Sequence, residues 1–224
     1  MRLFNYIKNN CNKTKKELNE LNSQNLILVN GTKMNLSYHV KDSDIVTVNG
    51  KVVSTVEYKY YLYNKPIGVV CTNDTSIINN IKTVTNINDR IYSVGRLDKM
   101  SHGLVILTND GALTHFILSP DTHLEKEYIV KVNKDITDDF LKKMEESYII
   151  KGKQTKCAKC KKIANDTFSI ILKEGKYHQI RIMTHLNGYE VIDLFRWRIA
   201  SITIDDLEGK QLKEIKDLKK RMEE

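Results

Sequence analysis

Cysteine and long apolar runs are scarce in this chain of 224 residues, and each scarcity excludes a class of protein. The four cysteines, Cys11, Cys71, Cys157 and Cys160, are too few and too scattered for a disulfide framework. No segment approaches the length of a transmembrane helix. The first residues, MRLFNYIKNN, carry charges and asparagines where a signal peptide needs an apolar core. We therefore expect a cytoplasmic protein with no membrane partner.

Signatures of cofactor and metal binding are also missing. The chain has neither a phosphate-binding GxxxxGK[ST] loop nor a dinucleotide fingerprint, so we predict no cofactor. Cys157 and Cys160 form one CxxC pair, which supplies two of the four ligands that a structural zinc site needs. His178 or His185 would have to complete such a site. We favour the alternative, a lysine-rich strand segment that lies against nucleic acid, and predict no metal.

What the chain has in excess is positive charge. The formal net charge is +8 and the isoelectric point is about 9.1, which favours a polyanionic partner, although such a charge also serves solubility. Nucleic acid is the better candidate than a membrane surface, because no amphipathic helix joins a basic face to a strongly apolar one.

Residues 1–54 form a small separate domain by their pattern. The segment Thr14-Lys15-Lys16-Glu17 matches a capping box at a helix start, and a second helix carrying Leu3, Phe4 and Ile7 precedes it. Short strands follow, turned by Asn-Gly pairs at 30–31 and 49–50. This domain carries half of the formal net charge of the chain. The arrangement resembles the S4-like RNA-binding domain, with solvated basic helices as the alternative.

Residues 55–224 indicate an α+β domain with a large, mostly antiparallel sheet flanked by helices. The expected strands fall at 56–63, 68–71, 103–108, 125–132, 168–174 and 189–195. Helices are expected over 137–146 and 177–187, after the Thr-Asn-Asp-Gly turn at 108–111, and over the charged tail from 207.

The segment Gly95-Arg96-Leu97-Asp98 places a carboxylate just before a buried strand. Asp98 is either a turn residue or a fixed nucleophile or base, and the segment alone does not decide between them. Tyr128 is either a core ring or the wall of a pocket, because it shares a strand face with Val130 and Val132. His178, Arg181 and His185 are spaced to lie on one side of a helix, where they cover an anion or pair with a buried Asp.

Taken in this order, the segments KPIG, GRLDKMSHGLVILTNDG, EKEYIV and GKYHQIR resemble the RsuA/RluB/RluE/RluF-type family of ribosomal RNA pseudouridine synthases, most closely the RluF-type branch. The resemblance covers essentially the whole chain. It implies that Asp98 is the catalytic residue, that Arg181 holds it ionised through an ion pair, and that Tyr128 stacks on the target base. Whether Asp98 acts as nucleophile or as base stays open.

The resemblance and the charge pattern together predict ribosomal RNA as the partner of a monomeric enzyme, with the large-subunit RNA favoured over the small-subunit RNA. A non-catalytic RNA-binding or ribosome-assembly factor is the alternative from another functional class. The residues predicted to contact RNA are Arg2, Lys8, Lys15, Lys16, Lys65, Arg96, Lys176, His178, Arg196 and Arg198.

Three positions depart from the family pattern. Tyr177-His178 precedes Gln-Ile-Arg, where RsuA-type relatives commonly have Asn-Arg. The form with histidine is more similar to the RluA-type group. Ile182 replaces a second arginine, and Met100 replaces a more usual polar residue. These changes leave Arg181 in place but put the RNA contacts of its helix in doubt.

Overall fold

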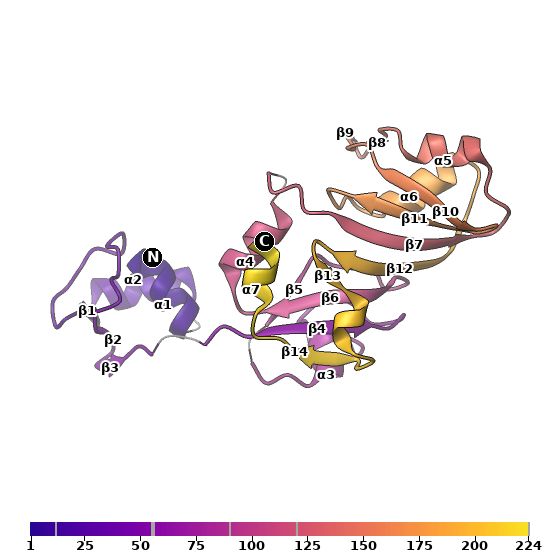
Figure 1. Cartoon of the computed structure of the whole chain (residues 1–224). Helices are drawn as coiled ribbons and strands as arrows, with labels where there is room; N and C mark the ends of the chain where they lie inside the picture. Colours follow the sequence, from indigo (N-terminus) through magenta and orange to yellow (C-terminus); the bar gives the residue numbers. More distant parts are fainter. Residues whose placement is uncertain (12, 55–56, 90, 120, 224) are drawn as a thin grey trace. The chain divides into compact units, whose positions relative to one another are not determined.

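The computed structural model describes residues 1–11, 13–54, 57–89, 91–119 and 121–223. The chain divides into two compact units, Met1–Glu57 and Tyr58–Glu224, which are described separately below (Figure 1). The predicted domain boundary lies within a few residues of this division. Residue 55, the first of the predicted second domain, lies outside the described residues.

The first unit contains two helices followed by short strands, as the sequence pattern predicts. Its elements are α1 (Leu3–Cys11), α2 (Lys15–Ser23), β1 (Ile27–Val29), β2 (Val46–Val48) and β3 (Lys51–Val52). The capping box is formed, since Thr14 and Glu17 each accept a hydrogen bond from the other's backbone N–H. Asn49 and Gly50 both have positive φ, at 51° and 73°, and turn β2 into β3.

The second unit alternates strands with short helices. Its elements, in order, are β4 (Tyr60–Lys65), α3 (Ile81–Thr85), β5 (Tyr92–Val94), β6 (His102–Thr108), α4 (Gly111–Leu118), β7 (Lys126–Val132), α5 (Asp138–Met144), β8 (Ile149–Ile150), β9 (Lys153–Gln154), β10 (Lys159–Ala164), β11 (Thr167–Leu172), α6 (Gln179–Leu186), β12 (Val191–Ile199), β13 (Ile202–Thr203), η1 (Ile204–Leu207), β14 (Leu212–Glu214) and α7 (Leu218–Glu223).

Nine of these strands form one sheet, in the order β10-β11-β7-β12-β6-β4-β14, with β13 paired to β12 and β5 paired to β6. Every strand pair in it is antiparallel except β12 with β6. The predicted α+β fold with a large, mostly antiparallel sheet is therefore confirmed for this unit. The parallel pair joins two antiparallel halves at the middle of the sheet.

Gly103 makes the parallel junction possible. Its φ of +104° suits glycine, and a Cβ at this position would lie 2.4 Å from the carbonyl oxygen of Arg196. The register pairs Phe195 with His102 and Arg196 with Gly103. The backbones of β6 and β12 thus approach each other at a distance that a side chain at 103 would prevent.

Two apolar cores cover the sheet. Helices α4 and α7 lie side by side and pack Leu113, Ile117, Leu218 and Met222 against β4, β5 and β6 (Figure 1). The second core places α5 and α6 against β7 and β11. Residues 103–107 of β6 are buried in succession because this strand is covered on both faces.

Three of the expected elements are corrected. Residues 68–71 form a loop in which only Val70 makes an isolated bridge, to Asn80. The tail from 207 is not one helix, because β14 pairs with β4 and only α7 is helical. The strand expected over 56–63 runs over β4 instead, and its first residue, Val56, lies outside the described residues.

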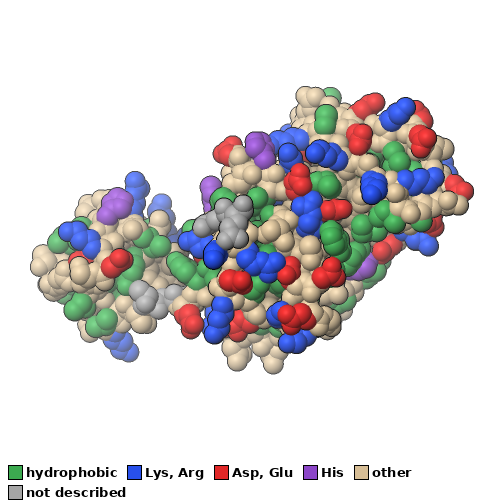
Figure 2. Space-filling model, in the orientation of Figure 1, with side chains coloured by type: hydrophobic (Ala, Val, Ile, Leu, Met, Phe, Trp, Pro, Cys, Tyr) green, Lys and Arg blue, Asp and Glu red, His purple; other side chains and the backbone are tan. Residues whose placement is uncertain are grey.

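None of the helices in the described ranges combines the length and the apolar character that crossing a membrane requires. On the face that Figure 2 shows, Lys and Arg side chains are interspersed with Asp and Glu over the second unit. Mixed charges of this kind do not create a strong single-sign field. On this face, no single region stands out by its charge, so the positive charges of interest are those that line the cavity of the second unit.

Candidate active site

A cavity of about 940 Å³ lies in the second unit, beside the parallel junction of the sheet. The β5–β6 loop, the start of β7, the end of β11, the start of α6 and β12 all contribute to its walls. It brings together residues that are far apart in sequence. Among the predicted site residues, those that line it are Arg96, Asp98, Tyr128, Lys176, His178, Arg181 and Arg196.

The loop that carries Asp98 is fixed at several points. Gly95 has a φ of +70°, which turns the chain away from β5. Leu97 is buried and its backbone N–H donates to the Sγ atom of Cys71 at 3.3 Å. The carbonyl oxygen of Asp98 accepts from the N–H of Ser101 at 3.0 Å, which closes a turn. The carboxylate of Asp98 is thereby presented to the cavity from a rigid support.

His178 is the ionisable partner that faces this carboxylate. Its Nε2 atom lies 3.3 Å from Oδ1 of Asp98, and each side chain is 38% exposed. Helix α6 begins at Gln179, later than predicted, so His178 is its N-cap residue and does not share a helix face with Arg181. His178 has the left-handed φ of 48°, uncommon for a residue with a side chain. Its ring stacks on Tyr177 with 4.0 Å between the centroids.

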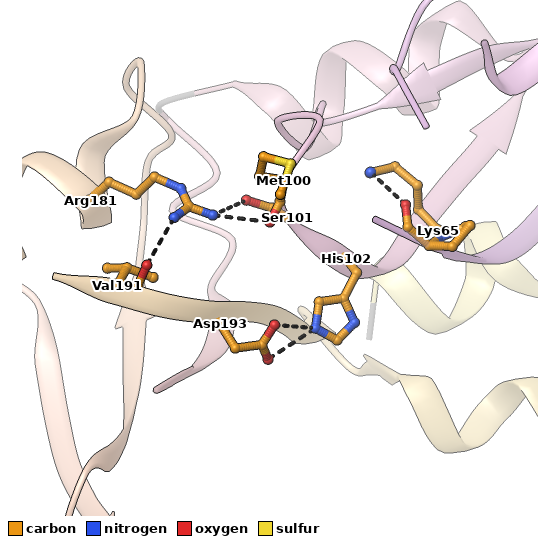
Figure 3. Close-up of polar contacts among 8 residues, drawn as sticks. Lys65, Met100, Ser101, His102, Arg181, Val191 and Asp193 are labelled. Carbon is orange, nitrogen blue, oxygen red and sulfur yellow. Dashed lines mark hydrogen bonds and ion pairs between the residues drawn. The ribbon is translucent and has the colours of Figure 1, made fainter. Parts of the chain in front are cut away.

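Among the described residues, no ion pair within 4.0 Å joins Arg181 to Asp98, so the expected pair is not formed in this structure. Nη2 of Arg181 donates to the carbonyl oxygen of Met100 at 3.0 Å and to Oγ of Ser101 at 3.4 Å (Figure 3). Nη1 donates to the carbonyl oxygen of Val191 at 3.5 Å. The guanidinium therefore ties the turn after Asp98 to β12. Arg181 supports the loop that carries the carboxylate, and His178 takes the position beside the carboxylate itself.

His102 strengthens the same junction. Its Nε2 atom lies 2.9 Å from Oδ1 of Asp193 on β12, and its ring packs on Phe195 at 5.0 Å between centroids (Figure 3). The turn after Asp98 is thus held to β12 from two sides, by Arg181 and by His102. Both contacts cross the parallel pair of strands, so the position of the turn depends on that pair.

Tyr128 is both a core ring and part of a cavity wall, the two alternatives that the sequence left open. It is only 7% exposed and belongs to the apolar core, yet it also lines the cavity. Tyr128 pairs across the strands with Arg196, so both side chains point to the same face of the sheet. A buried ring at the wall of a cavity offers an apolar surface on which a flat group can stack.

Two of the residues predicted to contact RNA, Arg196 and Lys65, have buried side chains. Arg196 is 1% exposed and donates through Nε to the carbonyl oxygen of Leu104 at 2.7 Å. Lys65 is fully buried and its Nζ atom donates to the carbonyl oxygens of Pro66 and Val69 at 2.9 and 2.8 Å. Burial lowers the pKa of Lys65. Both cations hold loops beside the cavity.

The other residues predicted to contact RNA differ in their exposure and in whether a carboxylate already pairs with them. Arg198 is held by Glu127 at 2.9 Å and Glu125 at 3.1 Å, and Lys176 is paired with Glu174. A β-bulge between Arg196 and Arg198 turns the two arginines to opposite faces of the sheet. Arg96 is exposed at the cavity. The remaining four are exposed on the first unit: Arg2, Lys8, Lys15 and Lys16.

Neither cysteine of the CxxC pair is among the residues that line the cavity, although Lys156, next to Cys157, is. Cys157 is exposed and Cys160 stands on β10, where burial raises the pKa of its thiol to about 12. In the described parts of the chain, no group of three or more His, Cys, Asp and Glu side chains is placed to hold a metal ion.

Sequence reasoning missed Lys126, which lines the cavity although it is 9% exposed. The signal was present in the strand alternation, because Lys126 stands two residues before Tyr128 and so shares its face. His178 was predicted as an RNA contact and, with Arg181 and His185, as a possible partner of an Asp. Its place beside Asp98 is reached with a left-handed backbone conformation that the sequence pattern does not predict.

Comparison with known proteins places this geometry in a family. Residues 59–186 match the RNA pseudouridylate synthase family. The dual-specificity RNA pseudouridine synthase RluF of Shigella flexneri is 38% identical over 221 residues, which are 97% of this chain and 75% of the relative. The ribosomal small subunit pseudouridine synthase A of Haemophilus influenzae is 29% identical, covering 92% of this chain and 91% of that one.

A solved structure agrees with these relatives. A crystal structure of a pseudouridylate synthase superimposes with a TM-score of 0.67 at 28% identity, and the match covers 98% of this chain and 97% of the other. The similarity extends over both units and includes β12, which lies beyond the segment matched to the family. The resemblance carried by the GRLD, EKEYIV and HQIR segments is thus confirmed, and the chain belongs to the RNA pseudouridine synthases of the RsuA/RluF type.

Proposed function

We propose that this enzyme isomerises specific uridines to pseudouridine in ribosomal RNA, with the large-subunit RNA as the favoured substrate. The observation that carries the proposal is the position of Asp98, on a rigid loop at the wall of a cavity that Tyr128 and Arg96 also line. The cavity of about 940 Å³ is large enough for a nucleotide turned out of its strand.

The chemistry is an exchange of one bond for another within a single nucleotide. The N-glycosidic bond between N1 and C1′ breaks, the uracil turns in place, and a bond forms between C5 and C1′. One proton leaves C5 and one is added to N1, so atoms and electrons balance without an external reagent. Asp98 either attacks C1′ as a nucleophile or removes a ribose proton as a base.

The surrounding residues take supporting roles in this proposal. Tyr128 stacks on the extruded uracil and so offsets part of the cost of unstacking, which is on the order of a few kcal/mol. Arg96 lies at the exposed rim and contacts the nucleotide's phosphates. Arg181 keeps the turn after Asp98 in place through Met100 and Ser101. His178 lies beside the carboxylate, with its Nε2 atom 3.3 Å from Oδ1 of Asp98.

The first unit is proposed to be an S4-like RNA-binding domain that delivers the substrate. Its two helices and short strands agree with that architecture, and Lys8, Lys15 and Lys16 are exposed on the helices. Because lysine contacts displace counterions from phosphates, RNA binding should weaken steeply as salt rises. Binding that does not depend on salt would contradict this role. We further propose that the enzyme works as a monomer in the cytoplasm.

The choice between the two ribosomal RNAs rests on the relatives. The identity of 38% to RluF, a protein named for dual specificity, exceeds the 29% to the small-subunit enzyme of Haemophilus influenzae. The small-subunit RNA is the close alternative. Mapping pseudouridines in both ribosomal RNAs, with and without the gene, decides between them. A pseudouridine lost only from the small-subunit RNA would overturn our preference.

Substitution of Asp98 separates the enzyme from a non-catalytic assembly factor. Asp98→Asn preserves the shape of the side chain and removes its charge. The variant should bind a ribosomal RNA transcript with unchanged affinity and form no pseudouridine, as measured by mass spectrometry of the digested RNA. Wild-type protein that forms no pseudouridine, in transcripts or in ribosomes from a deletion strain, would favour the assembly factor.

A further inference from the structure

Two positively charged side chains line the inner part of the cavity without a carboxylate partner. Lys126 and Arg196 are 9% and 1% exposed, respectively, and both line the cavity. Lys126 donates through Nζ to the carbonyl oxygen of Leu124 at 3.2 Å. Arg196 donates to the carbonyl oxygens of Leu104 and Gly95 at 2.7 and 2.8 Å. Among the described residues, neither forms an ion pair within 4.0 Å.

Both side chains keep unused hydrogen-bond donors. A lysine ammonium has three N–H groups and an arginine guanidinium has five. The recorded bonds of Arg196 involve Nε and Nη2, which leaves Nη1 without a recorded partner. A Cβ at Gly95 would lie 3.6 Å from this Nη1 atom. Leu118 lies at the same distance from that position, through a side-chain methyl carbon, and Gly95, Leu118 and Arg196 all line the cavity.

A buried charge is unfavourable unless an opposite charge offsets the loss of water. Burial lowers the pKa of Lys126, and the charge of Arg196 lowers it further. The fold nevertheless keeps both cations at one cavity wall, where an entering anion would gain two charge-assisted contacts. In an RNA strand, the anionic groups are the phosphates.

We propose that Lys126 and Arg196 form a phosphate subsite, which a phosphodiester next to the target uridine occupies when that nucleotide enters the cavity. This inference rests on the proposed function, because it takes the ligand to be RNA. Arg196 shares its strand face with Tyr128, the proposed stacking ring, and binds the loop that carries Asp98. The subsite would therefore fix the sugar-phosphate backbone relative to both the base and the carboxylate.

The test uses the whole protein and three simple probes: uridine, uridine 5′-monophosphate and uridine 3′-monophosphate. Calorimetric titration of the wild type should show at least one monophosphate binding about tenfold or more tightly than uridine. Lys126→Met should reduce this preference to about twofold while leaving the affinity for uridine unchanged. Arg196→Lys, which keeps the charge but cannot make both carbonyl contacts, should give an intermediate preference.

Lys131→Met is the matched control. Lys131 stands on the same strand, is exposed on its other face and is paired with Asp166 at 3.4 Å. This variant should keep the wild-type preference for the monophosphate. Circular dichroism and thermal unfolding of each variant establish that it is folded, and Lys126→Gln is used if the methionine variant is not.

Three results would overturn the subsite: no preference of the wild type for either monophosphate, no binding of either at millimolar concentration, or an unchanged preference in Lys126→Met. Inorganic phosphate is a fourth probe. If inorganic phosphate binds as tightly as the monophosphates, the subsite recognises a free anion, and the assignment of the subsite to an RNA phosphodiester fails. Pseudouridine formation is measured separately, so an inactive wild type that still prefers the monophosphate through Lys126 would contradict the proposed function alone.

Discussion

Nη2 of Arg196 donates to the carbonyl oxygen of Gly95 at 2.8 Å, across 101 residues of sequence. The bond joins β12 to the loop that carries Asp98, and Nε of the same guanidinium binds β6 at Leu104. One buried side chain thus joins β12 to β6 and to the loop that carries Asp98.

The parallel junction should not tolerate a side chain at residue 103. Gly103→Ala would place a Cβ 2.4 Å from the carbonyl oxygen of Arg196, in a backbone conformation with positive φ. We expect the free energy of unfolding to fall by about 2–4 kcal/mol in denaturant titrations. Gly111→Ala is the control, because no atom lies within 4 Å of its Cβ position, and it should change stability by less than about 0.5 kcal/mol. Equal unfolding midpoints for the two variants would contradict the close approach.

Arg181 should act on turnover more than on RNA affinity. Arg181→Lys keeps a positive charge but loses the fork that reaches Met100 and Val191 together. We expect kcat to fall by about 100-fold, because the turn after Asp98 is displaced, while the dissociation constant for RNA stays within about threefold. Ser101→Ala removes only the 3.4 Å contact and should retain most of the activity. Equal loss in both variants would place the effect in the hydroxyl group.

The four cysteines should differ in reactivity. Cys157 is exposed, whereas burial raises the pKa values of Cys71 and Cys160, the latter to about 12. At pH 8 the thiolate fraction of Cys160 is then about one in ten thousand. Iodoacetamide followed by peptide mass spectrometry should therefore label Cys157 first and leave Cys71 and Cys160 unmodified until the protein unfolds. Labelling of Cys160 at the rate of Cys157 would show that its environment is open.

The capping box of α2 should respond to acid. Hydrogen bonds from Thr14 lower the pKa of the Glu17 carboxyl from its ordinary value of 4.5 to about 2. A carboxyl whose pKa is lower in the folded state contributes stability above its unfolded value, and this contribution is lost as pH falls from about 4.5 toward 2. NMR titration of the Glu17 side chain and amide exchange in α2 measure it. Glu17→Gln removes the titrating group, so its helix should show no corresponding change. A Glu17 midpoint near 4.5 in the wild type would contradict the prediction.

Local patterns predicted the central elements because those elements have a clear period or a clear cap. The alternation through Tyr128 and Val130 predicted β7, and the uninterrupted apolar run from Leu104 predicted β6. The turn at 108–111 led correctly to α4, since Asp110 caps the helix by accepting from Ala112 and Leu113.

The features that escaped prediction depend on partners distant in sequence. Residues 212–214, Leu-Lys-Glu, lie in a charged tail and are at most partly buried, and they form a strand by pairing with β4. Arg196 resembles a surface residue in the sequence, yet it is buried and donates to the carbonyl oxygens of Gly95 and Leu104. His178, and not Arg181, lies beside the Asp98 carboxylate because α6 begins only at Gln179. Sequence patterns locate such helix boundaries poorly.

The parallel pairing of β6 with β12 sets an order of events during synthesis. By the time Thr108 has left the ribosome, β4, β5 and β6 are available to one another, but β12 ends only at Ile199. Until then the loop with Asp98 lacks the guanidinium that anchors it, and the wall of the cavity is missing. A chain that ends before β12 therefore carries Asp98 without the complete cavity, and we expect such an incomplete product to form no pseudouridine.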